Sequence, residues 1–95
     1  MSEVVTAAVR ALSEKVSGDF DSIAKFVIEN EGALMIDSSG VRAGDEDADV
    51  TLSADSDTFQ AILGGELNPT TAFMTGKLSV DGDMGAAMKL GALLS

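Results

Sequence analysis

The run Asp45-Glu46-Asp47-Ala48-Asp49 gathers more potential metal ligands than any other stretch of the chain. Taken as the start of an EF-hand loop, it places carboxylates at the first, third and fifth positions. Such a loop then needs glycine at its sixth position and glutamate at its twelfth. Val50 and Ser56 stand there instead. We therefore predict a solvated acidic loop between two strands and no metal site.

Catalytic chemistry has few side chains to use. The chain contains neither His nor Cys, which excludes nucleophiles activated by His and zinc sites built on His or Cys. Paired carboxylates could act as acid and base, but the sequence does not indicate which pair would share a cleft. Gly64-Gly65 and Gly82 are isolated turn residues without a phosphate-binding fingerprint. We predict a protein that is not an enzyme and needs no cofactor.

The charge pattern narrows the choice of partner. Six basic residues against sixteen acidic ones give a formal net charge of −10. The basic residues are scattered singly, which argues against nucleic-acid binding and against stable docking on an anionic bilayer. Neither a secretory signal nor an apolar run of about 18 residues is found. We expect an acidic cytoplasmic protein with no transmembrane segment and at most transient membrane contact.

Hydrophobic periodicity predicts the elements that would position any site. A helix is expected from an N-cap at Ser2 to about Lys15, stopping before Gly18, and alternating residues then predict four strands. Their apolar positions are Ala24, Phe26 and Ile28, then Leu34 and Ile36, then Val41 and Ala43, then Val50 and Leu52. Short turns between neighbouring strands require antiparallel pairing.

The second half returns to helical spacing. Asp55 or Ser56 can cap a helix that Gly64-Gly65 stops, and Asn68 followed by Pro69 predicts the start of another. A strand over residues 77–81, which could pair differently from the others, and a last helix after Gly82 complete the chain. Residues 1–95 thus form one α+β domain, with about five strands in a mainly antiparallel sheet covered on one face by helices.

The last helix has more apolar surface than a surface helix needs. One stripe contains Met84, Ala87, Met88 and Gly91, and another contains Ala86, Leu90 and Leu93. Either the helix is buried between layers, or one face lines a cavity or a partner surface. Residue physics alone leaves these alternatives open.

A longer pattern resembles a known family. Asn68-Pro69, Ala72-Phe73, Gly76-Lys77-Leu78, Gly82, Met84-Gly85 and Met88-Lys89-Leu90 follow the signature of sterol carrier protein-2-like lipid-binding domains. The resemblance is sharp over residues 48–94 and extends over 1–47 in element order only. Glu66, Ser79, Asp81 and Asp83 make this region more acidic than is usual in the family.

The resemblance implies that the sheet and helices enclose an apolar tunnel, which binds or carries a hydrophobic small molecule such as a fatty acid, a fatty acyl derivative or a sterol. Short free-standing members are typical of bacteria. The residues expected at the wall are Phe59, Ile62, Leu63, Phe73, Met74, Met84, Met88 and Leu90. If Met88 and Phe73 face a buried wall, Met88→Glu or Phe73→Asp should lower both lipid binding and stability.

An alternative function fits the same residues. The exposed side of an apolar helix could serve a non-catalytic interaction or dimerisation module, a homodimer included, accessory to an enzyme that makes a lipid-soluble metabolite. Lipid that co-purifies at a defined mass would support the carrier, and a stable complex of clean protein would support the interaction module.

Overall fold

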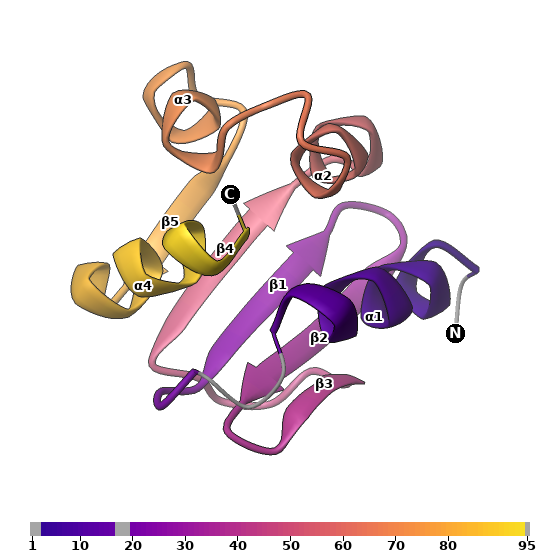
Figure 1. Cartoon of the computed structure of the whole chain (residues 1–95), viewed down its shortest axis with the longest axis vertical. Helices are drawn as coiled ribbons and strands as arrows, with labels where there is room; N and C mark the ends of the chain where they lie inside the picture. Colours follow the sequence, from indigo (N-terminus) through magenta and orange to yellow (C-terminus); the bar gives the residue numbers. More distant parts are fainter. Residues whose placement is uncertain (1–2, 17–19, 95) are drawn as a thin grey trace.

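The computed structural model describes residues 3–16 and 20–94, and its elements follow the predicted order (Figure 1). The predicted cap at Ser2 and helix stop at Gly18 lie outside the described residues. The elements are α1 (Glu3–Lys15), β1 (Ala24–Ile28), β2 (Gly32–Asp37), β3 (Gly40–Ala43), β4 (Val50–Ala54), α2 (Ser56–Leu63), α3 (Pro69–Met74), β5 (Ser79–Gly82) and α4 (Met84–Leu94).

The sheet has five strands in the order β3-β2-β1-β4-β5. Three neighbouring pairs are antiparallel, of which β1–β2 and β2–β3 were predicted, whereas β1 and β4 run parallel. The late strand β5 is antiparallel to β4, so the parallel pairing falls elsewhere than at the strand for which the sequence left it open. The pairing of β1 with β4 is parallel because residues 44–49 carry the chain from the edge strand β3 past β2 to the far side of β1.

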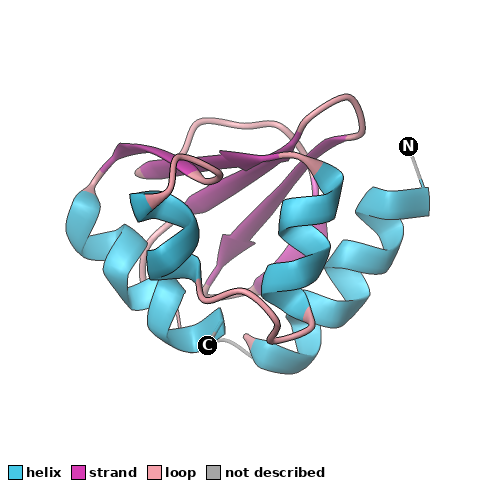
Figure 2. Cartoon of the chain, turned by 90° about the horizontal axis from the view of Figure 1, so that it is seen from above, coloured by secondary structure: helices cyan, strands magenta, loops and turns pink. Residues whose placement is uncertain are grey.

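All four helices cover the same face of the sheet, as Figure 2 shows. Phe26 on β1 projects into this layer, where it is aligned with Leu34 of β2 and Leu52 of β4. Its ring lies 4.4 Å from that of Phe59 on α2, at 58°, a tilted geometry that aromatic pairs favour. This contact joins α2 to β1, the central strand of the sheet.

The other face of the sheet is crossed by residues 44–49, which we call the acidic strap. Asp45 accepts a 2.8 Å hydrogen bond from Lys25 of β1, and Glu46 accepts one of 3.3 Å from Arg42 of β3. Met35 of β2, aligned with both of these cations, is fully buried although it stands outside the helix-side core. The acidic run of the sequence thus covers an apolar side chain and neutralises two cations.

Turn and cap residues explain where the elements begin. Asn68 Oδ1 accepts from the Thr70 backbone N–H at 2.8 Å, and Pro69 is the first residue of α3, as predicted. Gly82 has φ +115°, and a Cβ added there would collide with the carbonyl oxygen of Asp49. Glycine is therefore required where β5 approaches β4.

Within the described ranges, no helix is long and apolar enough to cross a bilayer.

Candidate functional site

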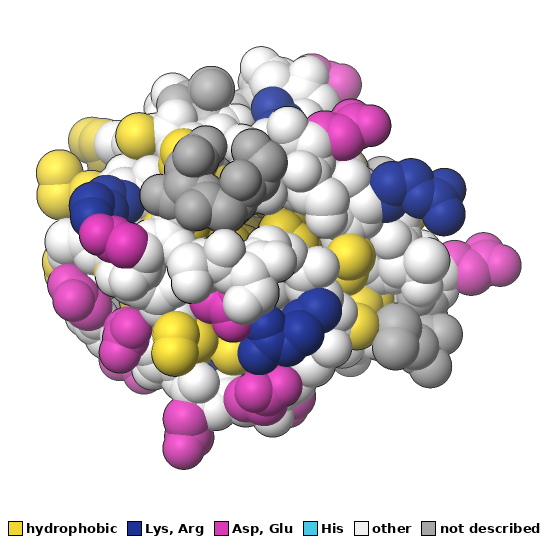
Figure 3. Space-filling view, turned by 60° about the horizontal axis from the view of Figure 1, so that its bottom comes forward, with side chains coloured by type: hydrophobic (Ala, Val, Ile, Leu, Met, Phe, Trp, Pro, Cys, Tyr) yellow, Lys and Arg dark blue, Asp and Glu magenta, His cyan; other side chains and the backbone are white. Residues whose placement is uncertain are grey.

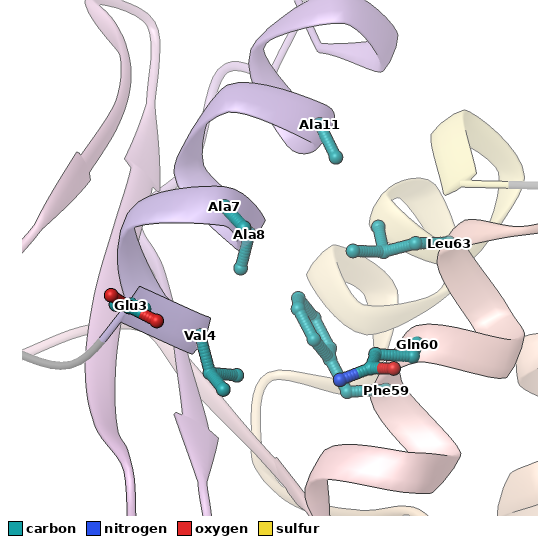
Figure 4. Close-up of a pocket in the computed structure, with 8 residues that line it drawn as sticks. All are labelled: Glu3, Val4, Ala7, Ala8, Ala11, Phe59, Gln60 and Leu63. Atoms are coloured by element: carbon teal, nitrogen blue, oxygen red, sulfur yellow. The ribbon is translucent and has the colours of Figure 1, made fainter.

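A groove opens between α1 and α2, on the helix side of the molecule (Figure 4). Its volume is about 300 Å³, at the lower end of the range for small-molecule pockets. In Figure 4 Val4, Ala8 and Ala11 of α1 face the Phe59 ring and the Leu63 side chain of α2 across the hollow, and Glu3 lies at the start of α1, farther from both. The lining residues are Glu3, Val4, Ala7, Ala8, Ala11, Phe59, Gln60 and Leu63.

The hollow exists because α1 presents small side chains to large ones. Ala7, Ala8 and Ala11 recur at helical spacing along the face of α1 that meets α2. Opposite them Phe59 is fully buried, because its ring also packs on Phe26 of β1, and it forms the floor of the groove. A methyl group extends far less than a leucine side chain, so the two helices can pack without filling the space between them.

The start of α2 is fixed by a side-chain cap. The backbone N–H of Thr58 donates to Asp55 Oδ1 at 2.7 Å. This backbone hydrogen bond, assisted by the Thr58 hydroxyl, lowers the pKa of Asp55 below its ordinary value. The cap holds the first turn of α2 and thereby orients Phe59 and Gln60 toward the groove.

The eight residues predicted from the resemblance separate into three groups. Phe59 and Leu63 line the groove. Ile62 and Leu90 are buried in the core. The other four are exposed on α3 and α4, with accessible fractions of 43% for Phe73, 78% for Met74, 47% for Met84 and 74% for Met88.

A second hollow, of about 220 Å³, lies along α4. It is lined by Phe20, Lys89, Ala92 and Leu93. The Lys89 ammonium makes hydrogen bonds of 2.8 and 2.9 Å to the two carboxylate oxygens of Asp21, and this contact lowers the pKa of Asp21. Its cation is thus already neutralised from within the chain.

The acidic strap does not assemble a metal site. Among the residues that the structure describes, no group of three or more carboxylates, His or Cys is placed to hold a metal ion. Arg42 also donates to Asp37 at 2.7 Å, and this hydrogen bond lowers the pKa of that carboxyl. Asp45, Glu46 and Asp37 are thus paired with cations of the sheet, and Asp49 accepts a hydrogen bond from the Ile23 backbone N–H.

Six of the lining residues were not predicted from the sequence. They are Glu3, Val4, Ala7, Ala8, Ala11 and Gln60. The signal that could have revealed them is the cluster of alanines on one face of the first helix, since a core-facing stripe usually carries longer side chains. Such a stripe also occurs in tight helix packing, so its meaning depends on what lies opposite.

Comparison with known proteins places this geometry in a family. Residues 5–95 match the model of the SCP-2 sterol transfer family. Hydroxysteroid dehydrogenase-like protein 2 of Xenopus laevis is 36% identical over 102 aligned residues, which cover 99% of this chain but 24% of that protein. The chain therefore spans about a quarter of the length of this relative.

Solved structures share the fold over nearly the whole chain. The second sterol carrier protein domain of Helicoverpa armigera superposes with a TM-score of 0.77 and 29% identity, covering 96% of this chain and 85% of that one. Sterol carrier protein-2 of Aedes aegypti, solved in complex with palmitate, has a TM-score of 0.79 and 20% identity, covering 100% and 97%. From its matched family model and its fold, the chain belongs to the SCP-2 sterol transfer family.

Proposed function

We propose that this domain binds the apolar part of a lipid-like molecule in the groove between α1 and α2, and that it acts as a carrier or binding module. The observation that carries the proposal is a hollow of about 300 Å³ whose wall is almost entirely aliphatic and aromatic. Water forms few hydrogen bonds with such a wall, so the transfer of an apolar tail from water into the groove is favourable. A palmitate complex of the Aedes aegypti protein gives a precedent for lipid binding by this fold.

The groove can be closed without disturbing the fold. Ala7→Leu and Ala11→Leu, made singly and together, extend side chains into the hollow toward Phe59 and Leu63. Leucine is a good helix former, so α1 should keep its stability. We expect the double variant to melt at the wild-type temperature or above it and to lose binding of dodecanol, measured by titration calorimetry.

Ser13→Leu is the matched control. Ser13 is exposed on α1 outside the groove lining, so the control adds the same side chain to the same helix without filling the hollow. It should bind dodecanol as the wild type does. A ligand at about one hundred times its Kd stabilises by about 2.7 kcal/mol, which raises the Tm of a domain this size by roughly ten degrees or more. Wild-type binding by the double variant would contradict the proposal.

A second function is supported by a different observation. Phe73, Met74, Met84 and Met88 expose large apolar side chains on α3 and α4, and the matched relative from Xenopus laevis carries this domain as a quarter of a longer chain. In this role the domain would dock to, or serve, an enzyme that acts on lipid-soluble substrates. Native mass spectrometry of protein isolated from its host separates the two: bound lipid supports the carrier, and a stable lipid-free complex supports the docking module.

A further inference from the structure

The polar groups at the groove are few and carry no positive charge. Of the eight lining residues, two are polar: Glu3, at the start of α1, and Gln60, on α2. Gln60 donates from its amide nitrogen to Ser56 Oγ at 3.1 Å. An amide also has a second N–H and a carbonyl oxygen with which to meet a ligand hydroxyl.

The Lys and Arg side chains lie outside the groove lining. None of the six Lys and Arg side chains, all of which lie in the described ranges, lines the groove. Lys25 and Arg42 are paired with carboxylates on the opposite face of the sheet, and Lys89 is paired with Asp21 beside α4. Figure 3 shows one face of the molecule, on which Lys and Arg side chains stand apart from one another among acidic ones.

The helix dipole offers no substitute. The amino end of α1 carries partial positive charge that would attract an anion, but Glu3 occupies its first turn with a carboxylate. The formal net charge of −10 adds a repulsive field for any anion that approaches. An anionic head group would therefore enter a site whose one charged lining residue, among the described residues, is also negative.

We infer that the groove selects uncharged amphiphiles, such as a fatty alcohol or another hydroxylated lipid, over ionised ones such as a fatty-acid anion. Glu3 is the residue that sets this selectivity, and the second amide N–H and the carbonyl oxygen of Gln60 are the groups that would meet a neutral head group. The inference rests on the proposed function, because it names the chemical class of ligand for the same groove.

The test compares two ligands with the same tail. Dodecanol and dodecanoate are titrated below their aggregation concentrations at about pH 8, where the carboxylate is ionised. We expect dodecanol to bind at least about threefold more tightly at an ionic strength of about 0.01 M. The difference should shrink at about 1 M salt, where the screening length falls from about 30 Å to 3 Å.

Two charge variants locate the effect. Glu3→Gln should strengthen dodecanoate binding at least about twofold relative to dodecanol binding. Glu14→Gln is the matched control, because it removes one negative charge from the same helix about 16 Å away. It should leave most of the difference between the two ligands in place.

The outcomes separate the two proposals. Equal affinity of the wild type for both ligands, or a difference that Glu3→Gln does not reduce, overturns the selectivity while the binding function stands. Binding of neither ligand overturns the binding function itself. Preference for dodecanoate would assign the groove to anionic lipids and contradict the role of Glu3.

Discussion

The two halves of the helical layer use similar residues in opposite ways. Between α1 and α2, small side chains face large ones across a gap, so Ala7 and Ala11 leave a hollow beside Phe59. Between α3 and α4, the small residue Gly91 faces Pro69, and a Cβ added at Gly91 would lie in ordinary van der Waals contact with the proline ring, at 4.0 Å. Leu90 and Leu94 of α4 are buried, but four other large apolar side chains of this half are exposed: Phe73, Met74, Met84 and Met88. Where the small residues lie decides whether an apolar helix pair forms a hollow or an exposed apolar surface.

Two phenylalanines test this contrast most strongly. Phe59 is fully buried and packs on Phe26, whereas Phe73 is 43% exposed on α3. We expect Phe59→Ala to lower the free energy of unfolding by about 3–5 kcal/mol. Phe73→Ala should lower it by less than about 1 kcal/mol. Urea denaturation of both variants measures the two values, and comparable losses would show that α3 is packed more firmly than its exposure indicates.

A charge at Met88 gives a smaller effect. If Met88 faced a buried wall, Met88→Glu would lower both stability and lipid binding. Its side chain is 74% exposed on α4, so the new carboxylate stays hydrated. We expect the free energy of unfolding to change by no more than about 0.5 kcal/mol and dodecanol binding to remain. Thermal melts and calorimetric titration, with Met88→Gln as the uncharged control, measure both properties. A loss of binding with stability intact would move the ligand site to α4.

The smallest expected effect is on the pH dependence of stability, to which the cap of α2 contributes and the cap of α3 does not. Asp55 has a pKa lowered mainly by the Thr58 N–H, while the cap of α3 is Asn68, which does not titrate. Because the folded-state pKa lies below the unfolded value, the stabilisation from Asp55 is complete above about pH 4 and is lost as the pH falls through the folded pKa. Asp55→Asn keeps a capping oxygen but removes this titration.

The measurement is Tm against pH for the wild type and Asp55→Asn. We expect the variant to lose stability less steeply on the acid side. Some acid dependence remains in both proteins, because Asp21 and Asp37 also have lowered pKa values. If the Tm of the two proteins fell equally steeply with decreasing pH, the cap of α2 would not contribute to the acid sensitivity of the fold.

Local signals in the sequence predicted most of the fold. Asn68-Pro69 encodes the start of α3 in two adjacent residues, and the alternation of Phe26 and Ile28 with less buried neighbours encodes the buried face of β1. The parallel pairing of β1 with β4 was not predicted, because it depends on how residues 44–49 cross the sheet. That path is set by contacts such as Lys25 with Asp45, which join residues distant in sequence.

The site was predicted less well for a related reason. Phe59 and Leu63 were expected at the wall because of the family resemblance, and they lie at the groove, although their contact with a ligand stays a prediction. The alanines of α1 were missed because the value of a small side chain lies in the space it leaves, which depends on the opposite helix. The methionines of α4 were expected at the wall because of the same resemblance. Their exposure was not predicted, because hydrophobicity does not specify which side of a helix faces inward. Lipid contact by those methionines, a cytoplasmic location and a bacterial source remain predictions.

The parallel alignment of β1 with β4 also has a consequence for how the chain folds. Strands β1, β2 and β3 are joined by two consecutive hairpins, so their contacts close short loops. The pairing of Ala24 with Val50, in contrast, joins residues that are 26 positions apart in the sequence. Closing a longer loop costs more chain entropy before its contacts form. We expect the three-stranded meander to form early and β4 to join it later, completing the β1–α2 contact beneath the groove. Destabilising β4 should then accelerate unfolding more than it slows refolding.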